Sequence, residues 1–210
     1  MIRVLIADDH AVFRRGLKET LGDAFTKVSL GEAQTAQETL ESVRKHDWQI
    51  VILDISMPGK SGLDILDELK RLRPRLPVLL LSMHPEEQFA RRALRAGAAG
   101  YLSKESVPGE LRVAVQRVLA GGRYVSTTLA EKLAYDLGKA ADTPVHELLS
   151  GREFQVLRMI ASGKTVKQIA DEIALSVKTV STYRGRILEK TGTKTTAGLI
   201  RYALQNHLVD

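Results

Sequence analysis

The sequence contains no cysteine and no long hydrophobic run. Without cysteine, the chain has no disulfides, thiolate zinc sites, iron–sulfur clusters or cysteine nucleophiles. No apolar stretch approaches the roughly 18 residues that a membrane span needs, and the apolar run before Asp8 is too short for a signal peptide. We therefore expect a cytoplasmic protein without a membrane partner.

The charge of the chain is positive and unevenly distributed. The 210 residues carry 31 Lys and Arg against 25 Asp and Glu, and the net charge is +6. Residues 150–210 alone hold ten of the bases but only five of the acids. A compact basic segment is typical of proteins that bind a polyanion, although a solvated surface gives the same count. Charge alone does not decide between these interpretations.

Five short apolar runs alternate with amphipathic stretches in the first 120 residues. The expected strands are 3–7, 28–33, 50–54, 78–82 and 100–103, and the expected helices are 12–21, 36–45, 63–73, 86–96 and 108–120. Such alternation forms right-handed βαβ units around a parallel sheet. It predicts an α/β, flavodoxin-like (βα)5 doubly wound domain, whose site lies beyond the carboxyl ends of the strands.

The alternation stops after residue 122, which suggests a division of the chain. We expect a first domain over residues 1–122 and a linker with one short helix over 123–146. The linker assignment rests on the glycine, aspartate and proline content of residues 138–146. From residue 150 onward only helical patterns remain, so an all-α domain is predicted over 147–210.

Acidic residues fall at the ends of two expected strands. Asp8 and Asp9 follow the first strand, and Asp54 closes the third. Because the carboxyl ends of parallel strands meet at one edge, these acids are expected to be neighbours. Packed carboxylates repel one another unless a cation lies among them, and Mg²⁺ suits carboxylate and phosphate oxygens. Ser82 ends the fourth strand and Lys104 follows the fifth, so the set suits phosphoryl transfer to an aspartate.

Each of these acids also has a local alternative. Asp8 or Asp9 could cap the helix that starts near residue 12. Asp54 could accept backbone N–H groups ahead of the turn at residues 58–59. The joint occurrence of the acids, the hydroxyl and the lysine at successive strand ends favours a common site.

Four segments closely resemble the receiver domains of two-component response regulators: VLIADDH (4–10), ILDISMPG (52–59), LSMH (81–84) and GYLSK (100–104). The resemblance covers residues 1 to about 122. It implies that a sensor histidine kinase phosphorylates Asp54. It also implies that Asp9, Asp54 and the backbone carbonyl of Ser56 hold Mg²⁺, with Asp8 bound through water.

The same resemblance assigns the remaining site residues. Lys104 would pair with the phosphoryl oxygens, and Ser82 and Tyr101 would form a switch pair. A haloacid-dehalogenase-like phosphatase is disfavoured, because Ser56 stands where that class needs a second acid. We therefore expect that the protein is not an enzyme, and that its only chemistry is Mg²⁺-dependent self-phosphorylation and autodephosphorylation.

The C-terminal segment shows the start signals of three helices. Ser150 with Glu153 and Thr165 with Gln168 are capping boxes, and Ser176 caps an expected helix over 177–191. Two helices joined by about three residues are typical of a helix-turn-helix. A three-helix module that binds a protein partner is the alternative. A last helix over 195–207 offers an apolar stripe that is mostly core.

The expected helix over 177–191 carries polar and basic residues on its outer face. Segments LSGREFQVL (149–157), KQIA (167–170) and SVKTVSTY (176–183) resemble a LuxR-type helix-turn-helix, so the whole chain resembles a NarL/FixJ-type response regulator. The resemblance implies binding to the major groove of double-stranded DNA, transcription regulation, and a homodimer on phosphorylation. The candidate DNA-binding residues are Lys178, Thr179, Ser181, Thr182, Arg184, Arg186 and Lys190.

Two residue types give no functional signal in the sequence. The five histidines are scattered without metal-ligand spacing. Trp48 is the lone tryptophan, and its place directly before a buried strand indicates a packing role.

Overall fold

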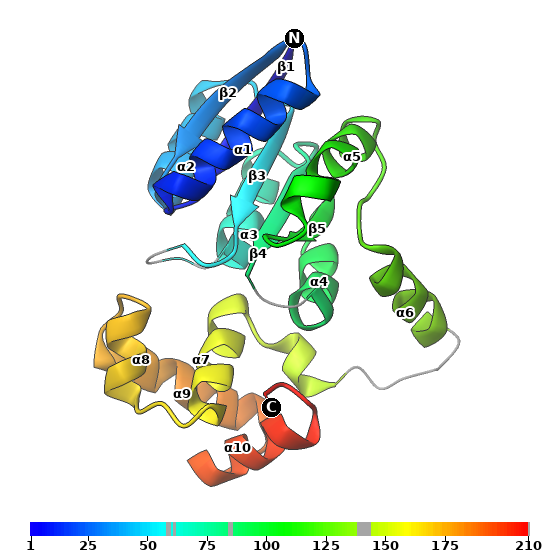
Figure 1. Cartoon of the computed structure of the whole chain (residues 1–210). Helices are drawn as coiled ribbons and strands as arrows, with labels where there is room; N and C mark the ends of the chain where they lie inside the picture. Colours follow the sequence, from blue (N-terminus) through cyan, green and yellow to red (C-terminus); the bar gives the residue numbers. More distant parts are fainter. Residues whose placement is uncertain (58–59, 61, 84–85, 138–143, 210) are drawn as a thin grey trace. The chain divides into compact units, whose positions relative to one another are not determined.

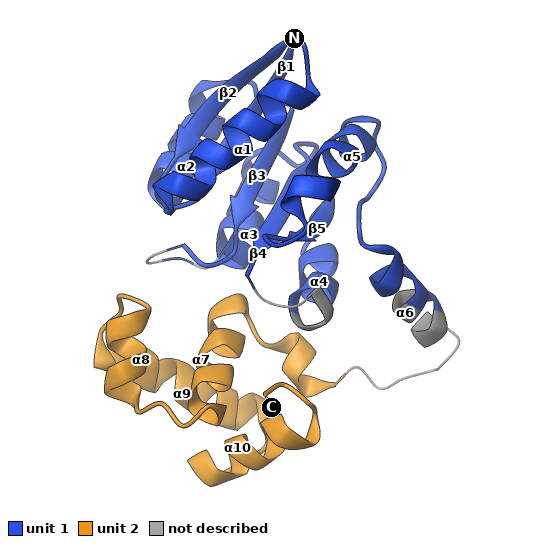
Figure 2. Ribbon diagram, viewed as in Figure 1, with its two compact units in different colours: residues 1–141 blue, residues 142–210 orange. Residues whose placement is uncertain are grey.

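The computed structural model describes residues 1–210 except 58–59, 61, 84–85, 138–143 and 210 (Figure 1). The chain divides into two compact units, Met1–Ala141 and Asp142–Asp210, called here the first and second unit (Figure 2). The expected turn at 58–59, the end of the LSMH segment and most of the expected linker segment 138–146 lie outside the described residues.

The first unit is built on a parallel five-stranded sheet with the strand order β2-β1-β3-β4-β5. The strands are β1 (Ile2–Ala7), β2 (Val28–Ala33), β3 (Ile50–Asp54), β4 (Val78–Ser82) and β5 (Gly100–Ser103). All residues of β3 and β4 are buried, as expected for uninterrupted apolar strands covered on both faces. The predicted doubly wound sheet is confirmed.

Five helices cover the two faces of this sheet. They are α1 (Ala11–Ala24), α2 (Ala36–Lys45), α3 (Gly62–Leu72), α4 (Glu86–Arg95) and α5 (Val107–Leu119). Helices α1 and α5 pack against each other on one face, and α2 packs against α3 on the other (Figure 1). Leu17 of α1 and Leu111 of α5 belong to a buried cluster with Ile6 and Ile52 of the sheet. This core fixes the positions at which the strands end.

The chain after α5 remains paired with the sheet. The N–H of Tyr124 donates to the carbonyl of Ala99 (2.9 Å), and the Tyr124 carbonyl accepts from the N–H of Tyr101 (3.1 Å). The Tyr124 hydroxyl also donates to Glu110 (2.8 Å). Tyr124 therefore covers the edge of β5, although it falls in the segment that the sequence pattern assigns to the linker. Helix α6 (Thr127–Leu137) follows within the first unit.

The second unit is helical in its described residues. It contains the 3-10 helix η1 (Val145–Leu148) and the α-helices α7 (Gly151–Ala161), α8 (Val166–Glu172), α9 (Val177–Thr191) and α10 (Thr196–Gln205). Both predicted capping boxes are present: Ser150 with Glu153, and Thr165 with Gln168. Ser176 caps α9 by accepting from the N–H of Thr179 (3.0 Å). The predicted all-α arrangement is confirmed.

Two short segments of the second unit depend on contacts that local sequence patterns do not show. Ala174 adopts φ = 52° between α8 and α9, and the N–H of Leu175 donates to the Ala170 carbonyl, which closes the predicted turn. Helix η1 begins within the end of the expected linker, and the N–H of its His146 donates to the Tyr202 hydroxyl of α10 (3.0 Å). No helix in the described part of the chain is both long and apolar enough to cross a bilayer.

Gly31 of β2 provides a test of the packing around Trp48. A Cβ atom at this position would lie 2.3 Å from Cη2 of the indole ring. We expect Gly31→Ala to lower the free energy of unfolding by about 1–3 kcal/mol, because the ring must move out of its contact with the strand. Urea unfolding followed by the fluorescence of Trp48 measures this change.

Gly16→Ala is the matched control for this prediction. A Cβ atom at Gly16, within α1, would meet no atom within 4 Å. This substitution is expected to raise stability by up to about 1 kcal/mol, because alanine favours a helix over glycine. An unchanged unfolding midpoint in Gly31→Ala would contradict the packing described here.

Candidate functional sites at the sheet edge and on helix α9

Three buried charged side chains meet at the carboxyl edge of the sheet in the first unit. Asp8 follows β1, Asp54 ends β3, and Lys104 follows β5. Nζ of Lys104 lies 2.6 Å from Oδ2 of Asp8 and 3.0 Å from Oδ2 of Asp54. Both aspartates are completely buried, and Lys104 is only 7% exposed. The parallel strands thus bring together the three residues that the sequence pattern indicates.

These charges shift one another's proton affinity. Burial raises the pKa of Asp54, and the charge of Asp8 adds to this effect while Lys104 opposes it. Burial acts against the charge of Lys104, but Asp54 and Asp8 outweigh it and hold the pKa of the amine above its usual value. The ring of Phe13, whose centroid lies 4.5 Å from Nζ, also stabilises the cation.

Asp9 and His10 extend the acidic group at this edge. One ligand atom from each of Asp8, Asp9, His10 and Asp54 lies within 4.8 Å of the others. Oδ1 of Asp9 is buried and accepts no hydrogen bond from any described residue, although Nδ1 of His10 lies 2.9 Å away. A buried carboxylate oxygen without a hydrogen-bond donor suits a cation. The group could therefore hold a metal ion.

The other predicted site residues also lie near this edge. The N–H of Ser56 donates to Oδ1 of Asp54 (3.2 Å). Asp54 therefore also accepts a backbone N–H group, which is the alternative role considered for it from the sequence. Ser82 pairs in register with Ser103, and Tyr101 pairs with Leu80. Ser82 and Tyr101 therefore point to the same face of neighbouring strands. Both are completely buried.

Three residues of the α1 region support the site but were not indicated by the sequence. They are His10, whose N–H donates to Oδ1 of Asp8 (2.7 Å), Phe13, and the buried Arg14. Nη1 of Arg14 donates to the carbonyl of Asp8 (2.8 Å), and its Nε donates to Glu32 of β2 (3.2 Å). The position of Arg14 one helical turn before the buried Leu17 was the available signal.

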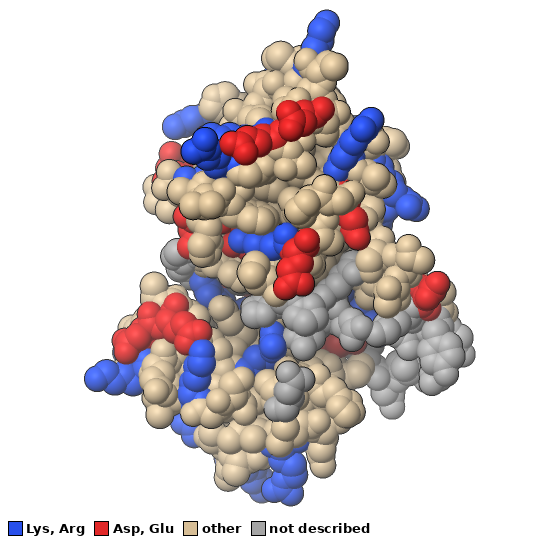
Figure 3. Space-filling model, viewed as in Figure 1, with Lys and Arg blue, Asp and Glu red and all other residues tan. Residues whose placement is uncertain are grey.

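Helix α9 presents a polar face in the second unit. Val180 and Ile187 are buried on its inner side. Ser176 engages the Thr179 hydroxyl (2.7 Å), and the Thr182 hydroxyl donates to the Lys178 carbonyl (3.0 Å). Figure 3 shows basic side chains along the outer margin of this unit and an acidic group over α8. Of the predicted DNA-binding residues, Thr179 and Arg184 are half-buried, and the exposed ones are Lys178, Ser181, Thr182, Arg186 and Lys190.

Lys190 differs from the other candidates because it has a partner inside the unit. Its Nζ lies 2.6 Å from Oε2 of Glu153, the same oxygen that accepts from the N–H of Ser150. Burial opposes the charge of Glu153, but Lys190 and Ser150 together hold the pKa of this carboxyl below its usual value. Lys190 therefore links α9 to the start of α7.

Family comparisons match both units of the chain. Residues 4–116 match the response regulator receiver domain, and residues 147–203 match the luxR family of bacterial regulatory proteins. The response regulator GacA of Pseudomonas protegens is 36% identical over 210 residues, covering 100% of this chain and 99% of GacA. The response regulator UvrY of Escherichia coli is 32% identical, covering 99% of this chain and 96% of UvrY.

Solved structures of RcsB are similar over nearly the whole chain. RcsB from Salmonella enterica serovar Typhimurium, bound to promoter rprA in the presence of the phosphomimetic BeF3⁻, gives a TM-score of 0.66 with 28% identity. The match covers 96% of this chain and 97% of that one. A second RcsB–DNA complex gives 0.60 with 25% identity, covering 97% and 98%.

The fold and the site define the class of this protein, which is a regulator that joins a receiver domain to a helical output domain. The features that define it are the parallel sheet, its acidic carboxyl edge and the helix-turn-helix unit. The comparisons then identify the family. The chain belongs to the two-component response regulators, in the NarL/FixJ-type branch that combines a receiver domain with a LuxR-type domain. The resemblance inferred from its motifs is confirmed.

The ion pair between Glu153 and Lys190 predicts a pH-dependent stability of the second unit. Because folding lowers the pKa of Glu153, its contribution is present above the unfolded pKa and is lost as the pH falls through the folded pKa. Glu153→Gln keeps an acceptor for Ser150 but removes the charge. We expect it to cost about 1–2 kcal/mol at about pH 7. The cost should be smaller at about pH 4, because the carboxyl of the unfolded chain is already largely protonated there.

A urea series followed by the NMR signals of α7 backbone amides measures this difference in the full chain. Glu189→Gln, on exposed Glu189 of α9, is the control with the same loss of charge. A Glu153→Gln penalty of equal size at both pH values would show that the ion pair is not its source.

Proposed function

We propose that the chain is phosphorylated on Asp54 by a sensor histidine kinase, and that phosphorylation switches its dimerisation and DNA binding to regulate transcription. The observation that carries this proposal is the position of the Lys104 amine, within hydrogen-bond distance of both Asp8 and Asp54. The family of the chain supports the same conclusion.

In the proposed transfer, a carboxylate oxygen of Asp54 forms a bond to phosphorus while the phosphorus–nitrogen bond of the kinase phosphohistidine breaks. Lys104 pairs with the transferred oxygens and leaves its contact with Asp54, while Ser56 N–H holds the carboxylate in place. No other group of this chain forms a covalent bond. Its own chemistry is then limited to self-phosphorylation from a phosphodonor and to autodephosphorylation, in which water attacks phosphorus, the bond to Asp54 breaks and inorganic phosphate leaves. Positioning and charge neutralisation are the contributions expected in phosphoryl transfer.

Mg²⁺ is the metal ion that we assign to the acidic group. Asp9, Asp54 and the Ser56 carbonyl would bind it, and Asp8 would bind through water. The bound ion would neutralise charge on the phosphoryl oxygens. The buried Oδ1 of Asp9, which accepts no hydrogen bond from the described residues, and the oxygen-rich donor set support this assignment.

We propose that Ser82 and Tyr101 transmit the phosphorylated state. The Ser82 hydroxyl moves toward the phosphoryl oxygens on Asp54, and the Tyr101 ring packs into the space released. The common face of Ser82 and Tyr101 on adjacent strands supports this coupling. Phosphorylation would thus bias two packings of the same surface.

The second unit is proposed to place α9 in the major groove of double-stranded DNA. The similar RcsB chains are described as bound to DNA, and α9 exposes the short hydroxyls of Ser181 and Thr182 beside the cation of Lys178. Short polar side chains near the start of a recognition helix suit base edges, and cations suit phosphates. A homodimer formed on phosphorylation would bind paired half-sites in the bacterial cytoplasm.

The first test is phosphorylation of Asp54 by a radiolabelled small phosphodonor with Mg²⁺. We expect the wild type to take up one phosphoryl group, and Asp54→Asn to take up none, because the amide is not a nucleophile for this step. Asp23→Asn, which changes an exposed aspartate of α1, should label like the wild type. Equal labelling of Asp54→Asn would refute the assignment.

The second test addresses DNA binding by α9. We expect Lys178→Ala and Arg184→Ala to weaken binding to a mixed-sequence duplex. Each should reduce the slope of log affinity against log salt concentration by about 0.9 for every DNA phosphate that the variant no longer neutralises. Fluorescence anisotropy over a salt series measures both quantities. Lys27→Ala, on an exposed lysine of the first unit, is the charge-matched control. Salt-independent binding, or unaffected variants, would favour a module that binds a protein partner.

A further inference from the structure

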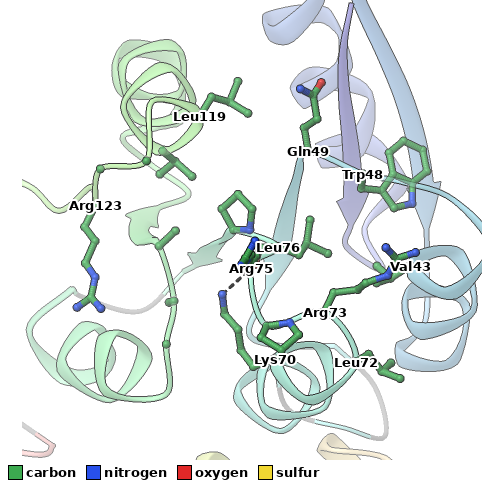
Figure 4. Close-up of a pocket in the computed structure, with 18 of the residues that line it drawn as sticks. Val43, Trp48, Gln49, Lys70, Leu72, Arg73, Arg75, Leu76, Leu119 and Arg123 are labelled. Atoms are coloured by element: carbon green, nitrogen blue, oxygen red, sulfur yellow. Dashed lines mark hydrogen bonds between the residues drawn. The ribbon is translucent and has the colours of Figure 1, made fainter.

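The opposite edge of the receiver sheet carries a basic pocket that the proposed function does not use. It has a volume of about 830 Å³ and lies where the loops before β3, β4 and β5 meet (Figure 4). Gln49, Pro77 and Ala99, each directly before one of these strands, all line it. A volume of this size accommodates a ligand as large as a nucleotide.

The pocket is lined by four cations, and among the described residues no aspartate or glutamate lines it. Lys70 belongs to the last turn of α3, Arg73 and Arg75 to the loop after it, and Arg123 to the segment after α5. Only Arg73 forms an ion pair with a described residue, Asp47, at 3.2 Å. The other three cations have no acidic partner in the described part of the chain.

Lys70 is the most constrained of these cations. Its half-buried amine donates to the Leu76 carbonyl (2.8 Å), which uses one of its three N–H donors. Burial lowers the pKa of Lys70, and the like charge of Arg123 lowers it further. Two cations that line the same pocket, with no acid among the described lining residues, favour the binding of an anion there. Figure 4 shows that their side chains come from different parts of the chain.

The rest of the pocket is less polar. Leu76, Leu119 and Trp48 are among the apolar and aromatic residues of its lining. The indole N–H is already used by Ser42, at 3.0 Å from Oγ, so the ring offers a mainly apolar surface to a ligand. An anion with an apolar or aromatic body fits this combination better than a bare inorganic ion.

We propose that this pocket binds a small organic phosphate, whose phosphate groups contact Lys70 and Arg123 and whose body lies along Leu76 toward Trp48. Phosphate oxygens accept charge-assisted hydrogen bonds from both types of cation. The site lies at the end of the sheet opposite Asp54, so it would provide the receiver unit with a second, non-covalent input. It does not depend on phosphorylation of Asp54.

The test titrates ADP into the full-length chain, with a chelator present to keep metal ions from the acidic edge. Calorimetry measures binding, and the fluorescence of Trp48, the only tryptophan, reports contact in the pocket. We expect saturable binding with a change in Trp48 emission. Adenosine, which lacks the phosphates, should bind at least about tenfold more weakly, because it cannot form the charge-assisted hydrogen bonds.

Two double variants with the same change in net charge locate the site. Lys70→Gln with Arg123→Gln should weaken ADP binding at least about tenfold. Lys27→Gln with Arg112→Gln, on exposed residues outside the pocket, should bind ADP like the wild type. An unchanged circular dichroism spectrum and unfolding midpoint would show that the Lys70/Arg123 double variant is still folded.

Several outcomes would overturn the proposal. They are an absence of saturable ADP binding, binding retained by the Lys70/Arg123 variant, or an equal loss in both double variants. Heat of binding without any response of Trp48 would refute the proposed placement of the ligand body. Labelling of Asp54 by a phosphodonor is a separate measurement, so failure here and failure of the proposed function are distinguishable.

Discussion

The receiver unit depends on one buried ammonium group. Lys104 contributes a positive charge between two carboxylates that are themselves completely removed from water. Removing one partner from such a group leaves an uncompensated buried charge, which is far more costly than the loss of an exposed ion pair. The parallel topology makes this arrangement possible, because it places the carboxyl ends of β1, β3 and β5 at the same edge.

The neighbours of Lys104 hold the carboxylates in a fixed arrangement. Backbone N–H groups of His10 and Ser56 donate to Asp8 and Asp54, and Arg14 holds the carbonyl of Asp8 while it contacts Glu32 of β2. One ammonium group does not balance all the acids gathered there. The edge therefore retains a negative charge that suits a metal ion, and Lys104 would supply the counter-charge in the phosphoryl transfer proposed above.

Local patterns predicted the elements of this chain well, because the signals for them lie within a few residues. The buried runs of β3 and β4 and the capping boxes of α7 and α8 are examples. Contacts between distant residues were not accessible in the same way. His146 of η1 donates to the Tyr202 hydroxyl, 56 residues away, and the partner of Lys190 is Glu153, 37 residues away.

The candidate sites follow the same division. The acids, Ser82 and Lys104 could be placed from the sequence because a parallel sheet dictates where strand ends meet. His10, Phe13 and Arg14 could not, because their roles depend on the packing of α1 against the site.

The cations of the basic pocket differ in whether the fold alone explains their positions. A cation in the last turn of a helix, such as Lys70, is favoured by the helix dipole and needs no ligand to explain it. Arg75 and Arg123 lie in loops beyond the helices. The dipole gives no reason for these two cations to line the same pocket, whereas a bound anion does.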